Sequence, residues 1–234
     1  MSGREGAAGV LRLFAPTEGA TRVVLVRHGQ ATCNVEGVVG GPKGCHGLSE
    51  LGRRQVGALA EILAESGELR RAGALYASVL PRAVETAELL RPSIGLVGLL
   101  PKILEQDDLS ELHPGQSDGM TWQEVIDTFG VPDWDVDPTR PIAPGGESWA
   151  TFVPRAAGAV RAIAQRHPGG QVVLAVHAGV IESTLIAFLG IGPLVSRRGW
   201  LRIQHASVTE WEFVPDQERW VLLRFNESRG VPQR

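Results

Sequence analysis

Short apolar runs alternate along the chain with segments whose apolar residues recur at helical spacing. Runs of consecutive β-formers at 23–26, 74–78 and 171–176 predict strands that are buried on both faces. Helical spacing and helix-start signals predict helices at 49–67, 81–90, 121–129, 152–166 and 180–189. Because strands and helices alternate, we expect an α/β fold, a three-layer α/β/α sandwich around a mostly parallel sheet.

The last third of the chain and one long central segment depart from this alternation. Residues 200–205, 208–214 and 220–225 predict three further strands, the last two joined as a hairpin at Pro215-Asp216. Residues 92–147 are rich in Pro, Gly and Asp and contain one short helical stretch. A segment of this kind inside a compact domain is usually functional. We therefore expect a loop and helix insertion that forms a lid.

Length and composition favour one domain. The 234 residues contain no linker between two autonomous apolar regions, so we expect a flexible N-terminal tail over 1–20 and a single domain over 21–234. A formal charge of −3 gives no global field for nucleic acid. No apolar run has the length of a membrane span, and the Gly/Ala-rich start lacks a signal-peptide core.

These features predict a cytoplasmic protein. The two cysteines, Cys33 and Cys45, are expected to be free thiols in a reducing compartment. A disulfide between them stays open. A zinc site is disfavoured, because no CxxC or paired histidine spacing accompanies them.

Candidate chemistry gathers at the ends of the three predicted central strands. Arg27 and His28 follow the first strand, Arg82 comes shortly after the second, and His177 follows the third. Ligands of open α/β sheets bind just past the carboxyl ends of the strands. Two arginines and two histidines on one rim would form an anion pocket, and the arginine fork suits a phosphoryl group.

The motifs around these residues resemble the histidine phosphatase superfamily, in its phosphoglycerate-mutase-like branch (branch 1). The stretch 27–34, RHGQATCN, resembles the signature of that branch. Residues 48–55, 78–87, 109–119, 146–148 and 176–181 are similar to its other motifs, in the same order. The resemblance covers nearly all of the chain from residue 21 to about 226. It implies a phosphoglycerate-mutase-like fold.

The resemblance also implies roles for individual residues. His28 would take the phosphoryl group and become a phosphohistidine, which splits one hard step into two easier ones. Arg27, Arg82 and His177 would hold the non-bridging oxygens. Further substrate-binding positions are Asn34, which would donate a hydrogen bond, Gln30 and Ala178. No cofactor and no metal are expected, because the arginines neutralise the phosphoryl charge.

The leaving oxygen needs a proton, which a carboxylic acid can supply. The stretch 105–111 holds four carboxylates, and on composition any of them could serve. Glu111 matches the acid position of the family by its spacing to Gly115 and to Asp118-Gly119. Asp108 stays open as the alternative.

The function expected from these residues is a phosphoric monoester hydrolase of the histidine acid phosphatase type. Its partner would be a small phosphorylated metabolite, with no nucleic acid and no membrane, and a homodimer stays open. One rival is a cofactor-dependent phosphoglycerate mutase, which the glycine-rich stretch 40–47 disfavours. The other rival is a binding protein that has lost catalysis, which the presence of all four rim residues disfavours.

Overall fold

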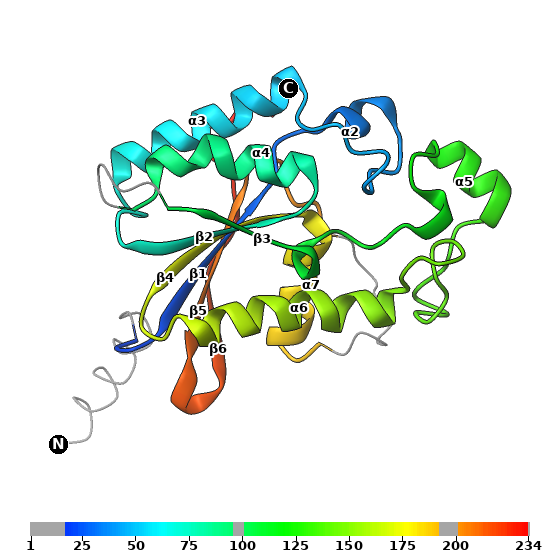
Figure 1. Ribbon diagram of the computed structural model, residues 1–234. Coiled ribbons are helices and arrows are strands. Elements are labelled where there is room, and N and C mark those ends of the chain that lie inside the picture. The colour runs from blue at the N-terminus through cyan, green and yellow to red at the C-terminus, as the bar shows by residue number, and fades with distance from the viewer. Residues whose placement is uncertain (1–16, 96–100, 192–200, 234) are drawn as a thin grey trace.

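The computed structural model describes residues 17–95, 101–191 and 201–233, and within them it contains one six-stranded sheet (Figure 1). The strand order is β3-β2-β4-β1-β5-β6. The first four strands of this order run parallel, and β5 and β6 add an antiparallel hairpin beside β1. The strands are β1 (Thr21–Arg27), β2 (Ala72–Ser78), β3 (Ile103–Gln106), β4 (Gln171–Val176), β5 (Val208–Val214) and β6 (Arg219–Glu227).

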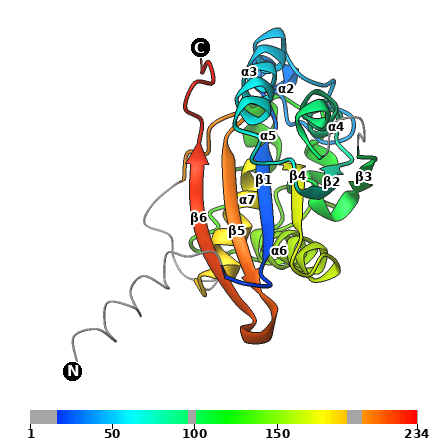
Figure 2. The same ribbon diagram turned by 90° about the vertical axis from the view of Figure 1, so that its left-hand side faces the viewer.

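Helices cover both faces of this sheet, as Figures 1 and 2 show. α3 (Glu50–Ser66) and α4 (Pro81–Leu90) pack on one face, and α6 (Trp149–Arg166) and α7 (Ala178–Phe188) pack on the other. The predicted three-layer α/β/α sandwich is confirmed. Shorter elements are α2 (Thr32–Glu36), α5 (Trp122–Phe129) and the 3-10 helices at Arg91–Ser93, Asp107–Leu109, Gly115–Ser117 and Pro215–Gln217.

The buried strands divide their side chains between two cores. On β1, Val23 and Leu25 join the cluster under α6 and α7, and Val24 and Val26 join the cluster under α3 and α4. All four side chains are fully buried. Successive side chains of a strand point to opposite faces, so an unbroken apolar run is what a doubly covered strand requires.

Local signals set several helix ends. The Ser49 hydroxyl accepts a hydrogen bond from the Gly52 backbone N–H at the start of α3, and Gly67 ends the helix at φ 66°. Thr121 and Glu124 form a reciprocal capping box on α5. Ser148 caps α6, which therefore begins at Trp149 rather than at residue 152.

Two parts of the prediction were wrong. The structure has no strand over 201–205, and Trp200 lies outside the described residues. The short strand β3 was not predicted.

Of the predicted tail, residues 1–16 lie outside the described residues, and the single-domain boundary stays a prediction. No helix in the described part of the chain is long and apolar enough to cross a membrane.

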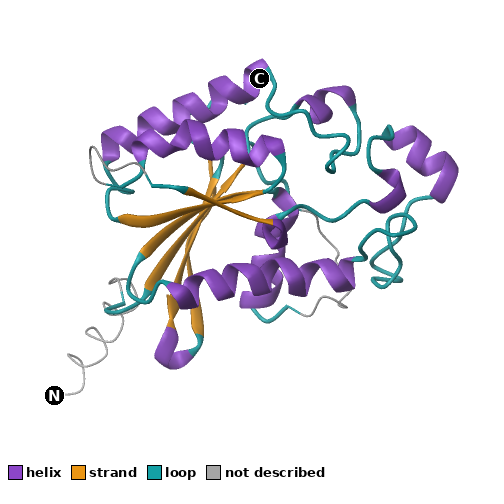
Figure 3. Ribbon diagram, viewed as in Figure 1, coloured by secondary structure: helices purple, strands orange, loops and turns teal. Residues whose placement is uncertain are grey.

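The insertion is tied to the loop that follows α2. The backbone N–H of Trp122 donates to the Gly37 carbonyl at 3.1 Å, and that of Val39 donates to the Met120 carbonyl at 2.8 Å. The Asp118 carboxylate accepts from the backbone N–H groups of Lys43 and Gly44 at 2.8 and 3.0 Å. Figure 3 shows these largely irregular segments together at one end of the molecule, beside α5. They form a unit that projects beyond the sheet.

Candidate active site

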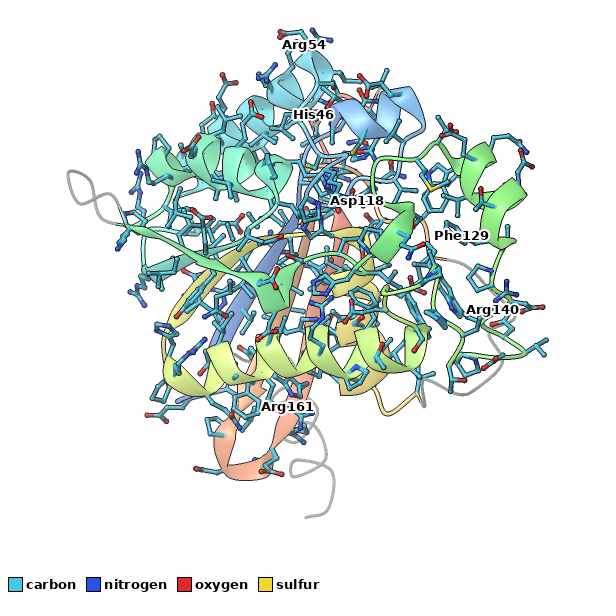
Figure 4. All side chains as sticks on the ribbon, turned by 45° about the vertical axis from the view of Figure 1, so that its right-hand side comes forward. His46, Arg54, Asp118, Phe129, Arg140 and Arg161 are labelled. Carbon is cyan, nitrogen blue, oxygen red and sulfur yellow. The ribbon has the colours of Figure 1, made fainter. Side chains whose placement is uncertain are left out.

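A cavity of about 430 Å³ opens between the rim of the sheet and the insertion. Its inner end is lined by Arg27, His28, Arg82 and Glu111. Its outer end is lined by residues of the 37–41 loop, the insertion and the start of α6, among them Trp122, Trp134 and Trp149. Figure 4 locates the insertion through Asp118, Phe129 and Arg140. The segment predicted as a lid thus forms one wall of this cavity.

Strand pairing brings the two rim histidines together. β1 and β4 are parallel neighbours, with Arg27 opposite Val176, so His28 and His177 leave the sheet at the same level. The backbone N–H of His28 donates to the Val176 carbonyl at 2.9 Å. The ring centroids of His28 and His177 lie 5.1 Å apart. The predicted convergence of the two imidazoles is observed.

Hydrogen bonds assign one tautomer to His28. Nδ1 lies 2.6 Å from the Gly29 carbonyl oxygen, which can only accept, so Nδ1 carries the proton. Nε2 then holds a lone pair, and it accepts a hydrogen bond from Nε of Arg82 at 3.2 Å. The side chain is buried, with 4% exposed, at the wall of the cavity. His28 therefore presents an unprotonated nitrogen beside a fixed cation.

The two arginines come from different elements. Arg82 lies in the first turn of α4, and its Nη1 donates to the Gly40 carbonyl at 2.6 Å. Arg27 ends β1, and its Nη1 donates to the Ile203 carbonyl. Burial lowers the pKa of Arg27 to about 10, against the opposing attraction of Glu111. Because that pKa stays well above 7, the Arg27 guanidinium remains a cation at neutral pH.

His177 is completely buried behind His28. Neither of its ring nitrogens has a hydrogen-bond partner among the described residues. Buried polar groups of folded proteins are nearly always paired. His177 is not among the residues that line the cavity, but its unpaired ring nitrogens lie next to His28, which does line it.

Both rim histidines are neutral at physiological pH. Burial is the main cause that lowers the pKa of His28 and of His177 well below the usual value, and the Arg82 charge adds to it in both cases. A neutral imidazole is the nucleophilic form of histidine. The same positive environment that suppresses protonation attracts an anionic ligand.

Glu111 faces the cavity from the loop that follows β3. Its two carboxylate oxygens accept from the backbone N–H groups of Gly179 and Leu112 at 3.0 and 3.1 Å. A β-carbon at position 179 would lie 2.1 Å from Oε1 of Glu111, so this approach requires glycine. Asp108, the alternative acid, is exposed and is not among the residues that line the cavity. The geometry favours Glu111.

A positioning group that sequence reasoning missed lies behind Glu111. Arg155 on α6 forms a bidentate pair with Glu147, at 2.7 and 2.6 Å. The same guanidinium donates to the carbonyls of Asp108, Ser110 and Glu111 at 2.9, 3.2 and 3.4 Å. Burial raises the pKa of Glu147, but the Arg155 hydrogen bonds and charge outweigh it, and the net pKa is lowered. Arg155 thus holds the backbone that carries Glu111.

The three predicted substrate-binding residues differ in position. Asn34 lines the cavity, and its Oδ1 accepts from the Ala31 N–H at 3.0 Å, which leaves the amide hydrogens as its donors. Gln30 is not among the lining residues, and its Oε1 accepts from the Ser49 hydroxyl at 2.7 Å. Ala178, the first residue of α7, is also absent from the lining. The structure brings Asn34, but neither of the others, to the cavity.

Two further features were not expected at this site. The His205 ring lies 5.9 Å from that of His28, although no motif marks it. Burial, followed by the Arg27 charge, lowers its pKa to about 3. Cys33 and Cys45 are buried free thiols, and Cys33 lines the cavity. A hydrogen bond from Cys33 lowers the pKa of Cys45 to about 5.

Among the described residues, no group of three or more His, Cys, Asp or Glu side chains could hold a metal ion. In the part of the chain that the structure describes, the charged side chains that line the cavity are Arg27, Arg82 and Glu111. Such a set suits an anion held by guanidinium groups.

Comparison with known proteins identifies relatives along most of the chain. Residues 23–228 match the model of the histidine phosphatase superfamily (branch 1). The chain is 33% identical over 170 residues to a metal-independent phosphoserine phosphatase of Arabidopsis thaliana, covering 70% of this chain and 66% of that protein. It is 34% identical over 229 residues to a glucosyl-3-phosphoglycerate phosphatase of Mycobacterium tuberculosis, covering 91% and 97%.

A solved structure gives the same picture of the fold. Bacillus stearothermophilus YhfR superimposes with a TM-score of 0.76 at 26% identity, covering 91% of this chain and all of that one. The region that matches the family model, residues 23–228, spans nearly the whole sheet and the helices that cover it.

Proposed function

From the premise that this chain belongs to branch 1 of the histidine phosphatase superfamily, we propose that it hydrolyses a small phosphomonoester through a phosphohistidine intermediate on His28. Its relatives include named phosphatases, which supports a phosphoric monoester hydrolase. The finer assignment, to the histidine acid phosphatase type of chemistry, is part of the proposal.

One observation carries the proposal. Nε2 of His28 is unprotonated, lies at the cavity wall and is flanked by the guanidinium of Arg82. A neutral imidazole beside a fixed cation is the combination that attack on a phosphate dianion requires, because the cation offsets the repulsion between nucleophile and ester.

In the first step, Nε2 of His28 attacks phosphorus and the bond from phosphorus to the leaving oxygen breaks. Arg27, Arg82 and His177 hold the non-bridging oxygens, and Asn34 donates a further hydrogen bond. The Glu111 carboxyl gives its proton to the leaving oxygen, so an alcohol departs. The phosphoryl group stays on His28.

In the second step, a water molecule attacks phosphorus and transfers a proton to the Glu111 carboxylate. The bond from phosphorus to Nε2 breaks, inorganic phosphate leaves and His28 regains its neutral form. One carboxyl thus serves as acid and then as base. Glu111 is proposed over Asp108 because it lines the cavity and Asp108 does not.

We propose that no metal takes part, since Arg27 and Arg82 supply the positive charge that a metal would otherwise bring. Turnover of a phosphomonoester is expected to be unchanged, within about twofold, in excess EDTA. A loss of activity that Mg²⁺ or Zn²⁺ restores would contradict this part of the proposal. Inorganic phosphate release gives the measurement.

The proposed partner is a small phosphorylated metabolite, because the cavity of about 430 Å³ has the size of a small-molecule site. We also propose a cytoplasmic location, which the two free buried thiols support.

The intermediate can be tested directly. Enzyme mixed with a ³²P-labelled phosphomonoester and quenched within milliseconds should carry label that is stable to base and labile to acid. Peptide mapping should place it on His28, and the His28→Ala variant should carry none. Label on Ser, Asp or Cys would overturn the phosphohistidine. Transfer of label to a second alcohol, without release of phosphate, would indicate a mutase instead.

A further inference from the structure

The outer half of the cavity differs in chemistry from the inner half. Apolar side chains from three segments line it: Val38, Leu112, Trp122, Trp134, Ile142 and Trp149. Three of the six tryptophans of the chain lie there. The leaving group of a phosphomonoester held on His28 has to occupy this half of the cavity.

The indole rings are held in place from different elements. Trp134 and Trp149 stack, with centroids 5.7 Å apart and an interplanar angle of 27°. Nε1 of Trp134 donates to the Arg140 carbonyl at 2.8 Å, and Arg140 in turn donates to the Phe129 carbonyl at 2.7 Å. Figure 4 shows Phe129 and Arg140 side by side at the outer end of the insertion. These bonds fix the stacked pair relative to α5.

Trp122 stands apart because it is 51% exposed. It occupies the first position of α5, and its backbone N–H donates to the carbonyl of Gly37, which also lines the cavity. A large aromatic side chain that is exposed at the mouth of a cavity is a candidate ligand contact.

Among the described residues that line the cavity, the charged side chains lie in the inner half. The cationic side chains that line the described cavity are Arg27 and Arg82, both of which face the phosphoryl position. A carboxylate on the leaving group would lie among indole rings, and no cationic side chain among the described residues of the outer half would pair with it. Removing an ionised group from water without a partner is costly.

We propose that the preferred substrates are phosphomonoesters of uncharged apolar or aromatic alcohols, whose body packs against Trp122 and the Trp134–Trp149 pair. This inference rests on the proposed phosphatase function. It names a substrate class that differs from the acids in the names of the plant and mycobacterial relatives.

The test compares alkyl esters, so that the basicity of the leaving group differs little. The probes are 2-phenylethyl phosphate, glycerol 1-phosphate, O-phosphoserine and 3-phosphoglycerate. We expect kcat/KM for 2-phenylethyl phosphate to exceed that for each of the other three by about 10- to 100-fold, the range that burial of a few apolar groups gives.

Variants at Trp122 then test whether this side chain causes the preference for the aromatic ester. Trp122→Ala should lower the ratio of kcat/KM for 2-phenylethyl phosphate to that for glycerol 1-phosphate by about tenfold, and Trp122→Phe should retain most of it. Ile126→Ala is the matched control, because Ile126 lies one turn further along α5, is 44% exposed and does not line the cavity. It should leave the ratio unchanged. Trp122→Arg should shift preference toward 3-phosphoglycerate.

The outcomes separate the two proposals. Turnover with a preference for phosphoserine or 3-phosphoglycerate, or an unchanged ratio in Trp122→Ala, would overturn the substrate class and leave the phosphatase intact. Turnover of none of the esters, p-nitrophenyl phosphate included, would overturn the proposed function and this inference with it.

Discussion

The two ends of the cavity are built in opposite ways. At the inner end, His28 and Arg82 are each 4% exposed, and His177, next to His28, is fully buried. Each lies just beyond the end of a strand or in the first turn of a helix. At the outer end, Trp122 is half exposed and belongs to an insertion with little regular structure. The inner end is fixed by the sheet, and the outer end is fixed by a few loop contacts.

This difference separates chemistry from selection of the leaving group. Strand pairing and buried hydrogen bonds hold the reacting groups, so their geometry is tied to the folding of the whole domain. The insertion can change sequence without disturbing that geometry, because loops tolerate substitution better than a buried rim does. Variants at the inner end should therefore affect all esters, and variants further out should affect some more than others.

The largest effect is expected at His28. His28→Ala removes the nucleophile and should lower turnover by at least about 10⁴-fold for alkyl and aryl esters alike. Steady-state phosphate release with both ester types gives the measurement, and circular dichroism checks the fold. If aryl esters retained substantial turnover in the variant, His28 would not be the nucleophile.

Glu111 also lines the inner end, but its effect should depend on the leaving group because its proposed role is to protonate the leaving oxygen. Glu111→Gln cannot protonate the leaving oxygen, so an alkyl ester should slow by about 10²–10⁴-fold. p-Nitrophenyl phosphate hardly needs that proton and should slow far less.

Asp108→Asn is the matched control for this carboxylate, because Asp108 lies on the same loop but is exposed. It should leave both rates near those of the unmodified enzyme. Equal losses on both esters in Glu111→Gln, or the selective pattern in Asp108→Asn, would show that the acid is assigned to the wrong residue.

Arg155 should have a smaller effect that passes through Glu111. Arg155→Ala removes five hydrogen bonds to the acid loop and to Glu147, and kcat for an alkyl ester should fall by about tenfold. In an enzyme that already carries Glu111→Gln, adding Arg155→Ala should lower kcat for the alkyl ester hardly any further, because Arg155 acts through Glu111. Arg161→Ala, on the exposed side of α6, is the control. A full additional loss in the double variant would contradict a positioning role.

The buried histidines predict the mildest effect, a dependence of stability on pH. The pKa values of His28, His177 and His205 are lowered in the folded chain, so the unfolded chain binds more protons below about pH 6.5. Above that pH these neutral histidines make their full contribution to the free energy of unfolding, and this contribution is lost as the pH falls. Each should reduce the free energy of unfolding by about 1.4 kcal/mol per pH unit between about pH 6 and pH 5.

His205→Gln isolates one of these groups. Urea unfolding of the variant should show a pH slope that is shallower by about 1.4 kcal/mol per unit. His46→Gln is the control, since His46 is exposed. An unchanged slope in His205→Gln would mean that His205 is not held neutral in the folded chain.

Much of the inner end was predictable because its signals are local. Buried strands can be recognised in the sequence as unbroken apolar runs, and Arg27, His28 and His177 come at the ends of such runs. Ser49 and Gly67 mark the ends of α3 by their capping chemistry. Parallel pairing of β1 with β4 then places both histidines on one rim without further information.

The remainder could not be predicted because it depends on contacts between distant segments. Arg155 reaches the acid loop across 44 to 47 residues, and nothing near it in sequence signals that role. The 201–205 segment has apolar residues that suit a strand, yet the Ile203 carbonyl accepts from Arg27 and the chain turns at His205. β3 was missed because it is a half-exposed edge of four residues, too short for a periodic pattern.

The stacked Trp134–Trp149 pair and the half-exposed Trp122 line the cavity. We therefore expect the tryptophan fluorescence of the protein to change when a ligand occupies the cavity. Indole emission depends on the polarity and proximity of neighbouring groups, and half of the tryptophans of this chain line this cavity. Intrinsic fluorescence can therefore follow arrival and departure of a leaving group in real time, without a dye or a chromogenic ester. Stopped-flow emission would then resolve release of the alcohol from release of phosphate, two events that steady-state phosphate assays merge.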